Sequence, residues 1–342
     1  MVNNTPRACN ANPLRIGVYM NINFTKFIKS IFISTIIVAI IGSSYIYINY
    51  ARIDKSIIDA ELAERNKITI SDNNIEVIGN NFSHILKLRK EFARRHNFKG
   101  IYINDHLLKL NDSKVKLYYT IDDENIIVKS DYLIKPSLNK LKLCFGDKSF
   151  EYDLALKYRY DFSDNNIENT YWYQNPTNWA AISDKGMTLM PSERKKANTL
   201  GFRRAFQNNV KIEAEVIPEG FPLNVSMFMD LGTSVFFGVG DDRSIQIIQS
   251  KYIGKTKTEK IVKRSYLPFQ KNELYKISVE NTNNSYEISI DKDGSNQLKL
   301  LYNDSTSEQN IKETYKNVGF AVWKNSKGLI VKSVTISSKD AM

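Results

Sequence analysis

Hydrophobic and polar positions follow three successive patterns along the chain. Residues 30–51 carry no charge and are rich in isoleucine. Residues 53–62 repeat isoleucine and leucine at the spacing of one helix face. From Lys67 onward, short runs alternate apolar with polar residues between Asn, Asp and Gly turns, which is typical of half-buried β-strands. The pattern predicts an all-β chain that follows an N-terminal helix.

The uncharged segment 30–51 is long enough to cross a membrane, because roughly 20 apolar residues in a helix span the hydrocarbon core. Tyrosines at its end suit the membrane interface. The alternative is a cleaved signal peptide, since residues 42–44 are small. The apolar stretch continues past them, which favours an anchor. We predict a cytoplasmic tail at 1–29, a transmembrane helix at 30–51 and a juxtamembrane helix or linker at 52–66.

Charge is unevenly distributed along a chain whose formal net charge is +11. Residues 1–52 carry about +5 and no acidic residue, which predicts that the N-terminus stays inside and the bulk of the chain lies outside. The remaining excess of roughly +6 is mild and predicts no nucleic-acid partner. Abundant Ile, Asn and Lys are typical of AT-rich bacterial genomes, so we predict a single-pass protein of the bacterial inner membrane with a periplasmic or extracellular bulk. Cys9 and Cys144 flank the apolar segment and are predicted not to pair.

Residues 67–157 are predicted to form a small β-sandwich of immunoglobulin-like or jelly-roll-like type. Runs such as KVKLYYTI and NKLKLCF supply its strands. One exception, SHILKLRKEFARR at 83–95, predicts a helix with Ser83 as its N-cap. The segment GIYINDHLL…DYLIKPSLNKLKLCF resembles accessory β-sandwiches of carbohydrate-active proteins, although Asp105 and Ser137 replace the expected glycines.

A polar linker is predicted at 158–170, and strands resume over 171–338 without a long helix. The runs VKIEAEV, LYKISVENTNNSYEISIDKDG and NVGFAVWKNSKGLIVKSVTI follow one another in this part of the chain. Their order resembles the concanavalin A-like lectin/glucanase jelly roll, including laminin-G-like modules, over residues 165–340. The resemblance implies a two-sheet β-sandwich, in a family that contains both lectins and glycoside hydrolases.

Glu213 and Glu215 are the candidate catalytic carboxylates. Alternate residues of a strand share one face, so their separation can approach the roughly 5–5.5 Å of a retaining glycosidase pair. The next acid, Glu219, lies beyond Pro218 and too far along for the glucanase motif. We therefore favour a polar strand face over an active site. The second domain has no histidine for a nucleophile–histidine pair, and the sequence predicts no metal site and no cofactor.

Aromatic residues around the stretch YWYQNPTNW are candidates for stacking against sugar rings. Trp179 begins an alternating strand and is predicted to be buried. The remaining rings could instead join the two sandwiches at the domain junction. The candidate ligand-binding residues are Tyr171, Trp172, Tyr173 and Trp323.

A basic cluster in the first domain is a candidate surface for anionic glycans or lipid headgroups. The alternative is a solvated helix face. The cluster consists of Lys87, Arg89, Lys90, Arg94, Arg95 and Lys99.

Together these features predict a membrane-anchored, non-catalytic lectin-like protein whose partner is a cell-envelope carbohydrate or polysaccharide. Two alternatives stay open. One is a glycoside hydrolase of the concanavalin A-like glucanase type. The other is a structural or assembly protein that binds envelope proteins through its sheet edges. The sequence predicts no oligomeric state.

Overall fold

The computed structural model describes residues 53–132, 134–162, 172–176, 179–191, 197–206, 209–230, 233–253, 256–267, 269–282, 285–303, 316–340 and 342. The predicted transmembrane helix at 30–51 and the candidate Tyr171 lie outside these residues. Within them, no helix is long and apolar enough to span a bilayer. Two compact units are present: unit 1 runs up to Val77 and includes 82–134 and 139–155, and unit 2 comprises 78–81, 135–138 and 156–342.

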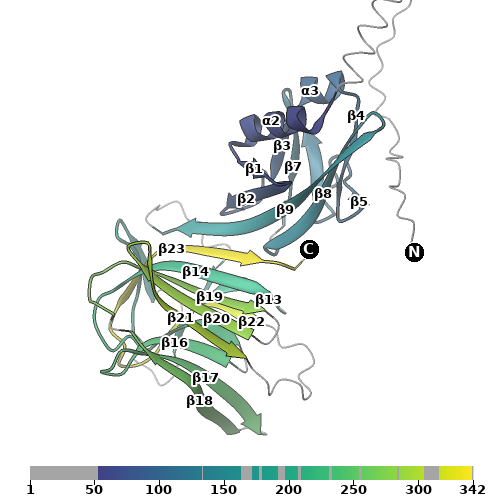
Figure 1. Cartoon of the computed structure of the whole chain (residues 1–342). Coiled ribbons are helices and arrows are strands. Elements are labelled where there is room, and N and C mark those ends of the chain that lie inside the picture. Colours follow the sequence, from purple (N-terminus) through teal and green to yellow (C-terminus); the bar gives the residue numbers. More distant parts are fainter. Residues whose placement is uncertain are drawn as a thin grey trace, which may run out of the picture. The chain divides into compact units, whose positions relative to one another are not determined.

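Unit 1 combines β-strands with two helices (Figure 1). Its elements are α2 (Lys55–Asn66), α3 (Lys90–Arg95), β1 (Ile70–Ser71), β2 (Asn74–Gly79), β3 (Leu86–Arg89), β4 (Phe98–Ile103), β5 (His106–Leu107), β6 (Tyr118–Ile121), β7 (Asn125–Lys129), β8 (Ser137–Phe145) and the first part of β9 (Lys148–Asp161). Strands β3, β7 and β6 form one antiparallel sheet, and β8 pairs with β4, which pairs with β5. Unit 1 is therefore rich in β-strands.

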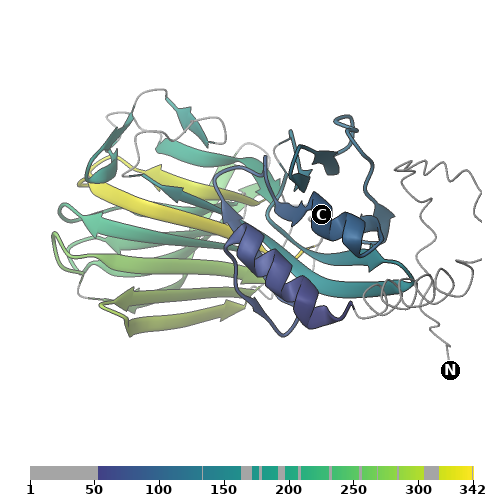
Figure 2. The same ribbon diagram turned by 90° about the horizontal axis from the view of Figure 1, so that it is seen from above.

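Helix α2 begins at its N-cap Asp54, whose side chain accepts a hydrogen bond from the Ile57 amide at 3.2 Å. It ends where Lys67 adopts a left-handed conformation, with φ 53°. Its inner face buries Ile58 and Leu62. Figure 2 shows α2 in purple, and its buried residues have the helical spacing that the sequence predicted.

The predicted helix at 83–95 is wrong over its first half. Residues 86–89 form β3, in which Leu86 and Leu88 are buried and alternate with half-buried residues, and only Lys90–Arg95 is helical. Leu86 pairs with Val128 of β7, so cross-strand bonding supplies the partners that a helical turn would otherwise provide. Ser83 caps no helix.

Unit 2 is a sandwich of two antiparallel sheets, which confirms the all-β prediction. One sheet has the order β10-β13-β22-β15-β16-β17-β18 and the other contains β21-β20-β19-β14-β23, with residues 158–161 of β9 paired to β23. Their bounds are β10 (Trp172–Asn175), β11 (Ala180–Ser183), β12 (Gly186–Leu189), β13 (Asn198–Phe206), β14 (Val210–Pro218), β15 (Val225–Asp230), β16 (Thr233–Val239), β17 (Ser244–Ile253), β18 (Thr256–Tyr266), β19 (Tyr275–Thr282), β20 (Ser285–Lys292), β21 (Ser295–Asn303), β22 (Lys316–Val322) and β23 (Leu329–Ser338).

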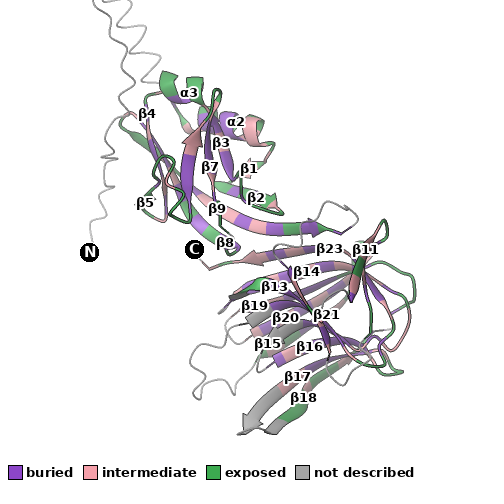
Figure 3. Cartoon of the chain, turned by 180° about the vertical axis from the view of Figure 1, so that it is seen from behind, coloured by how far each residue is buried: buried purple, intermediate pink, exposed green. Residues whose placement is uncertain are grey.

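The core of unit 2 lies between the two sheets. Strand β14 alternates buried and half-buried residues along its whole length, and Figure 3 shows a similar alternation of colours along β9. Tyr158 of β9 meets Phe202 of β13 with their ring centroids 5.2 Å apart, so an aromatic contact joins the two layers.

Cys144 is fully buried in unit 1 and takes part in a disulfide. The prediction that it is unpaired is therefore wrong. The chain's other cysteine, Cys9, lies outside the described residues.

Candidate functional site

The seven-stranded sheet of unit 2 presents a row of uncharged side chains on its outer face. The residues are register partners across five neighbouring strands, so the row spans about 19 Å at the usual strand spacing. Their neighbours Leu200, Phe237 and Ile247 are fully buried in the core, which fixes the row on the opposite face. We call this row the outer strip; it consists of Thr199, Ala321, Ser226, Phe236 and Gln246.

Tyr173 lies over the backbone beside one end of the outer strip. It pairs with Gly201, and a Cβ atom at Gly201 would stand 2.3 Å from the Tyr173 ring. Gly201 in turn faces Gly319 across the next strand pair. Gly201 therefore leaves the space that the Tyr173 ring occupies, and Gly319 allows the close approach of the β13 backbone. Burial raises the pKa of the Tyr173 hydroxyl, which stays neutral at physiological pH.

Trp323 follows β22 and lies two residues beyond Ala321 of the strip. Its ring centroid is 6.0 Å from that of Phe236, and the side chain is half-buried. Its indole nitrogen is buried and has no hydrogen-bond partner among the described residues. Trp323 thus offers part of an aromatic surface next to an unused donor.

Polar groups form the floor of the strip near β17. The Gln246 amide donates to the Ser244 hydroxyl at 2.9 Å, and that hydroxyl donates to the Val239 carbonyl at 3.1 Å. Gln246 is 4% exposed and Ser226 is 2% exposed, so these groups are held in fixed positions. The strip therefore holds ordered polar groups, and Thr199 is its one member that is not buried.

Trp172 does not belong to this surface, and the prediction that it is exposed is wrong. It is 2% exposed and packs edge-on against Tyr160, with centroids 5.5 Å apart, and against Phe202 at 5.7 Å. Strand alternation is the reason, because Trp172 and Tyr173 are adjacent residues of β10 and must face opposite sides. The prediction that Trp179 is buried is confirmed, and its indole donates to the Thr199 carbonyl at 3.1 Å.

Glu213 and Glu215 lie on the outer face of the other sheet, as their spacing predicted. Together with Arg159 and Lys276 they line a small depression of about 50 Å³, which we call the charged face. Glu215 accepts a hydrogen bond from the Ser333 hydroxyl at 2.8 Å. The volume admits a polar group rather than a whole sugar ring.

Glu213 is held as a carboxylate by two lysines. Its oxygen lies 3.1 Å from Lys211 Nζ and 3.4 Å from Lys276 Nζ. Burial raises the pKa of Glu213, but the charges and hydrogen bonds of these lysines outweigh burial and leave the pKa below its ordinary value. Such a group is a poor general acid.

The basic cluster of unit 1 is divided by the structure. Arg89 pairs with Glu61, which is 2% exposed and also accepts the Arg89 backbone amide at 2.8 Å. The pairing joins α2 to β3, so Arg89 is structural. Lys87 is half-buried on β3, whereas Lys90, Arg94 and Arg95 are exposed on α3 and Lys99 is half-buried on β4.

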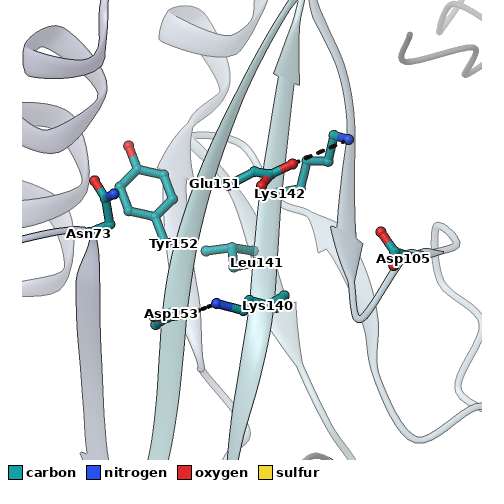
Figure 4. Close-up of a pocket in the computed structure, with 8 residues that line it drawn as sticks. All are labelled: Asn73, Asp105, Lys140, Leu141, Lys142, Glu151, Tyr152 and Asp153. Atoms are coloured by element: carbon teal, nitrogen blue, oxygen red, sulfur yellow. Dashed lines mark hydrogen bonds and ion pairs between the residues drawn. The ribbon is translucent and has the colours of Figure 1, made fainter. Parts of the chain in front are cut away.

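A larger hollow of about 330 Å³ lies on unit 1 (Figure 4). Two ion pairs between β8 and β9 cross it: Lys140 with Asp153, and Lys142 with Glu151 at 3.4 Å. Asp105, on the turn between β4 and β5, forms one wall. No local sequence pattern indicates this hollow, since its residues come from separate turns and strands. Because its lysines are already paired with carboxylates, it offers few free charges to a ligand.

Within the described residues, no group of three or more His, Cys, Asp or Glu side chains is arranged to hold a metal ion.

No protein-family model matches the chain, and no curated protein sequence matches it. Solved structures are similar in fold. The metal-free VIP36 exoplasmic/lumenal domain is 10% identical with a TM-score of 0.39, covering 53% of this chain and 91% of that one. Crh5 transglycosylase in complex with NAG is 17% identical with a TM-score of 0.40 over 53% and 84% of the two chains. Lectin II from Ulex europaeus is 11% identical with a TM-score of 0.36 over 54% and 98%. At TM-scores below 0.5 these likenesses establish neither family nor function, and the fold rests on the strand pairings described above.

Proposed function

We propose that unit 2 binds a carbohydrate at the outer strip without hydrolysing it. The observation that carries the proposal is the placement of Tyr173 and Trp323 on one outer face, on either side of a row of uncharged side chains. Sugar rings have apolar faces that can lie on aromatic rings, and hydroxyls that bond to Ser, Thr and Gln side chains. Tyr173, Trp323 and the polar residues of the strip supply both kinds of partner on one face of the sheet.

The charged face supports binding or structure better than hydrolysis. A glycosidase needs one carboxyl whose pKa is raised, so that it can protonate the leaving group. Glu213 has a lowered pKa and two lysine partners instead. The hydrolase alternative predicts reducing ends released from a bound glycan, and their loss in Glu213→Gln and Glu215→Gln proteins.

We further propose that residues 30–51 anchor the protein in a bacterial inner membrane with residues 1–29 inside. The uncharged sequence of this segment supports the proposal. An anchored chain resists extraction from membranes by alkaline carbonate, whereas release of the protein would contradict the anchor. Protease added to intact spheroplasts tests the orientation. Digestion of residues 1–29 with protection of the bulk of the chain would contradict it.

A glycan array probed with the purified full-length chain tests carbohydrate binding. We expect a subset of glycans to bind, and binding to fall roughly tenfold in Trp323→Ala, as for loss of an aromatic anchor. Tyr132→Ala is the matched control, since Tyr132 is an exposed aromatic residue of unit 1.

The outcomes separate the alternatives. Binding that Trp323→Ala leaves intact would place the carbohydrate site elsewhere. No binding to any neutral or anionic glycan would contradict a lectin-like function. Capture of a defined envelope protein in that case would favour the assembly alternative.

A further inference from the structure

We infer that one end of unit 1 rests on the membrane surface through three basic side chains that contact anionic lipid headgroups. The three are Arg94, Arg95 and Lys99, which we call the turn-end cations. The inference rests on the proposed anchor at 30–51, and it is independent of the carbohydrate site in unit 2.

The chain enters unit 1 at the turn between β8 and β9. Ile53 is the first described residue and is 3% exposed. Its carbonyl accepts a hydrogen bond from Lys148 Nζ at 3.0 Å, and Lys148 is the first residue of β9. The start of the folded unit is therefore fastened to this turn, two residues after the predicted end of the membrane helix.

The C-terminal end of α3 meets the same turn. The amide of Gly146, in the turn, donates to the carbonyl of Asn97 at 2.8 Å. Phe92 of α3 packs edge-on against Phe145 at the end of β8, with ring centroids 5.9 Å apart. Figure 1 shows α3 close to the end of unit 1 where β8 joins β9. The turn-end cations and the entry point of the chain thus share one end of the unit.

The charge at this end is largely uncompensated. No ion pair within the described residues involves Arg94 or Lys99. Arg95 pairs with Glu91 at 3.0 Å, but both side chains are mostly exposed, so the pair is weak and can exchange for a lipid phosphate. Asp54 and Asp147 are the other acidic residues at the turn, and Asp54 is engaged as the cap of α2.

A short tether makes such contacts effective. Because Arg52 alone separates Ile53 from the predicted membrane segment, these cations are held within reach of the headgroups and lose little freedom on contact. Each basic residue at an anionic surface strengthens association roughly fivefold at low ionic strength. Arg89 contributes nothing, since Glu61 already holds it.

The test uses the full-length chain reconstituted into nanodiscs of pure phosphatidylcholine, or of phosphatidylcholine with 30 mol% phosphatidylglycerol as an experimental choice of roughly physiological surface charge. Amide hydrogen exchange of residues 90–99 is compared between the two. We expect exchange to slow at least about fivefold on the anionic discs, and the difference to vanish at high salt.

The triple variant Arg94→Gln, Arg95→Gln, Lys99→Gln should remove the lipid dependence. A matched triple variant on β18 also removes three positive charges and should keep the lipid dependence. It consists of Lys257→Gln, Lys260→Gln and Lys263→Gln. Equal exchange on both discs, or slowing that survives in the first variant, overturns the inference while the anchor stands. A chain that does not remain in the discs overturns the anchor and the inference together, and glycan binding is scored separately.

Discussion

The two outer faces of unit 2 differ in the chemistry that a ligand would meet. The charged face carries carboxylates and cations that already bond to one another or to neighbours, as Glu213 does with Lys211 and Lys276. The outer strip carries no charge, and its polar groups lie between aromatic rings. A ligand on the charged face must break ion pairs, whereas the residues of the strip carry no charge and form no ion pair. Strand alternation creates both faces, but side-chain chemistry makes only one of them suitable for a neutral polar ligand.

The largest effect on stability is expected in the core between the two sheets of unit 2. Trp172→Ala removes a ring packed among Tyr160, Phe162 and Phe202 and should lower the free energy of unfolding by about 3–5 kcal/mol. Urea unfolding of unit 2 measures the loss. A change below about 1 kcal/mol would contradict the placement of Trp172 in the core.

The next effect tests the glycine beneath Tyr173. Gly201→Ala places a methyl group where the Tyr173 ring lies and should cost about 1–3 kcal/mol of stability through overpacking. Gly294→Ala is the control for introducing a methyl group, since nothing lies within 4 Å of that position, although its φ of 74° adds local strain. If the double variant Gly201→Ala, Tyr173→Ala were no more stable than Gly201→Ala alone, the ring would not be the obstacle.

A smaller effect on stability distinguishes the half-exposed indole from the buried one. Trp323→Ala should lower the free energy of unfolding by roughly 1–2 kcal/mol, well below the loss in Trp172→Ala, because only part of its surface is buried. The same thermal or urea experiment compares the two variants. Equal losses would mean that Trp323 is a core residue, and the strip would lose one of its rings.

The smallest effect concerns the charged face. Because the pKa of Glu213 is lowered in the folded protein, its ion pairs stabilise the fold above the ordinary glutamate pKa of 4.5 and are lost as the pH falls below it. Glu213→Gln should therefore cost up to about 1 kcal/mol near pH 7, and the difference from the parent chain should shrink below pH 4.5.

Asp105→Asn serves as the control, because Asp105 is exposed on unit 1 and forms no ion pair within the described residues. A difference between parent and Glu213→Gln proteins that grows as the pH falls would show that the lysines do not hold Glu213 as a carboxylate.

Sequence periodicity predicted the strands of unit 2 and the shared face of Glu213 and Glu215, because alternation is a local property. Periodicity failed where the same residues fit both a strand pattern and a helix pattern. Leu86 and Leu88 alternate as in a strand, while Ile85, Leu88 and Phe92 also fit one helix face, and only pairing with β7 decides between them. The exposure of Trp172 was predicted wrongly because adjacent residues of a strand face opposite sides. The sequence does not show which of Trp172 and Tyr173 faces the core.

The outer strip itself could not be predicted from the sequence. It depends on register between strands distant in the chain, such as Thr199 with Ala321 and Ser226 with Phe236. Tyr173 and Trp323 were both candidates, yet nothing local indicated that they share a face. The glycine pair Gly201 and Gly319 was the one available signal, since glycine within a strand often marks close approach.

The position of the tryptophans has a consequence for spectroscopy. All three lie in unit 2, at 172, 179 and 323, so tryptophan emission from the full-length chain reports nothing directly about unit 1. Trp172 and Trp179 are buried and should emit at short wavelength and resist acrylamide, whereas Trp323 should be quenched. Thermal unfolding monitored by tryptophan emission therefore reports on unit 2, whereas far-ultraviolet circular dichroism reports on both units. A gap between the two melting curves would measure how independently the units unfold.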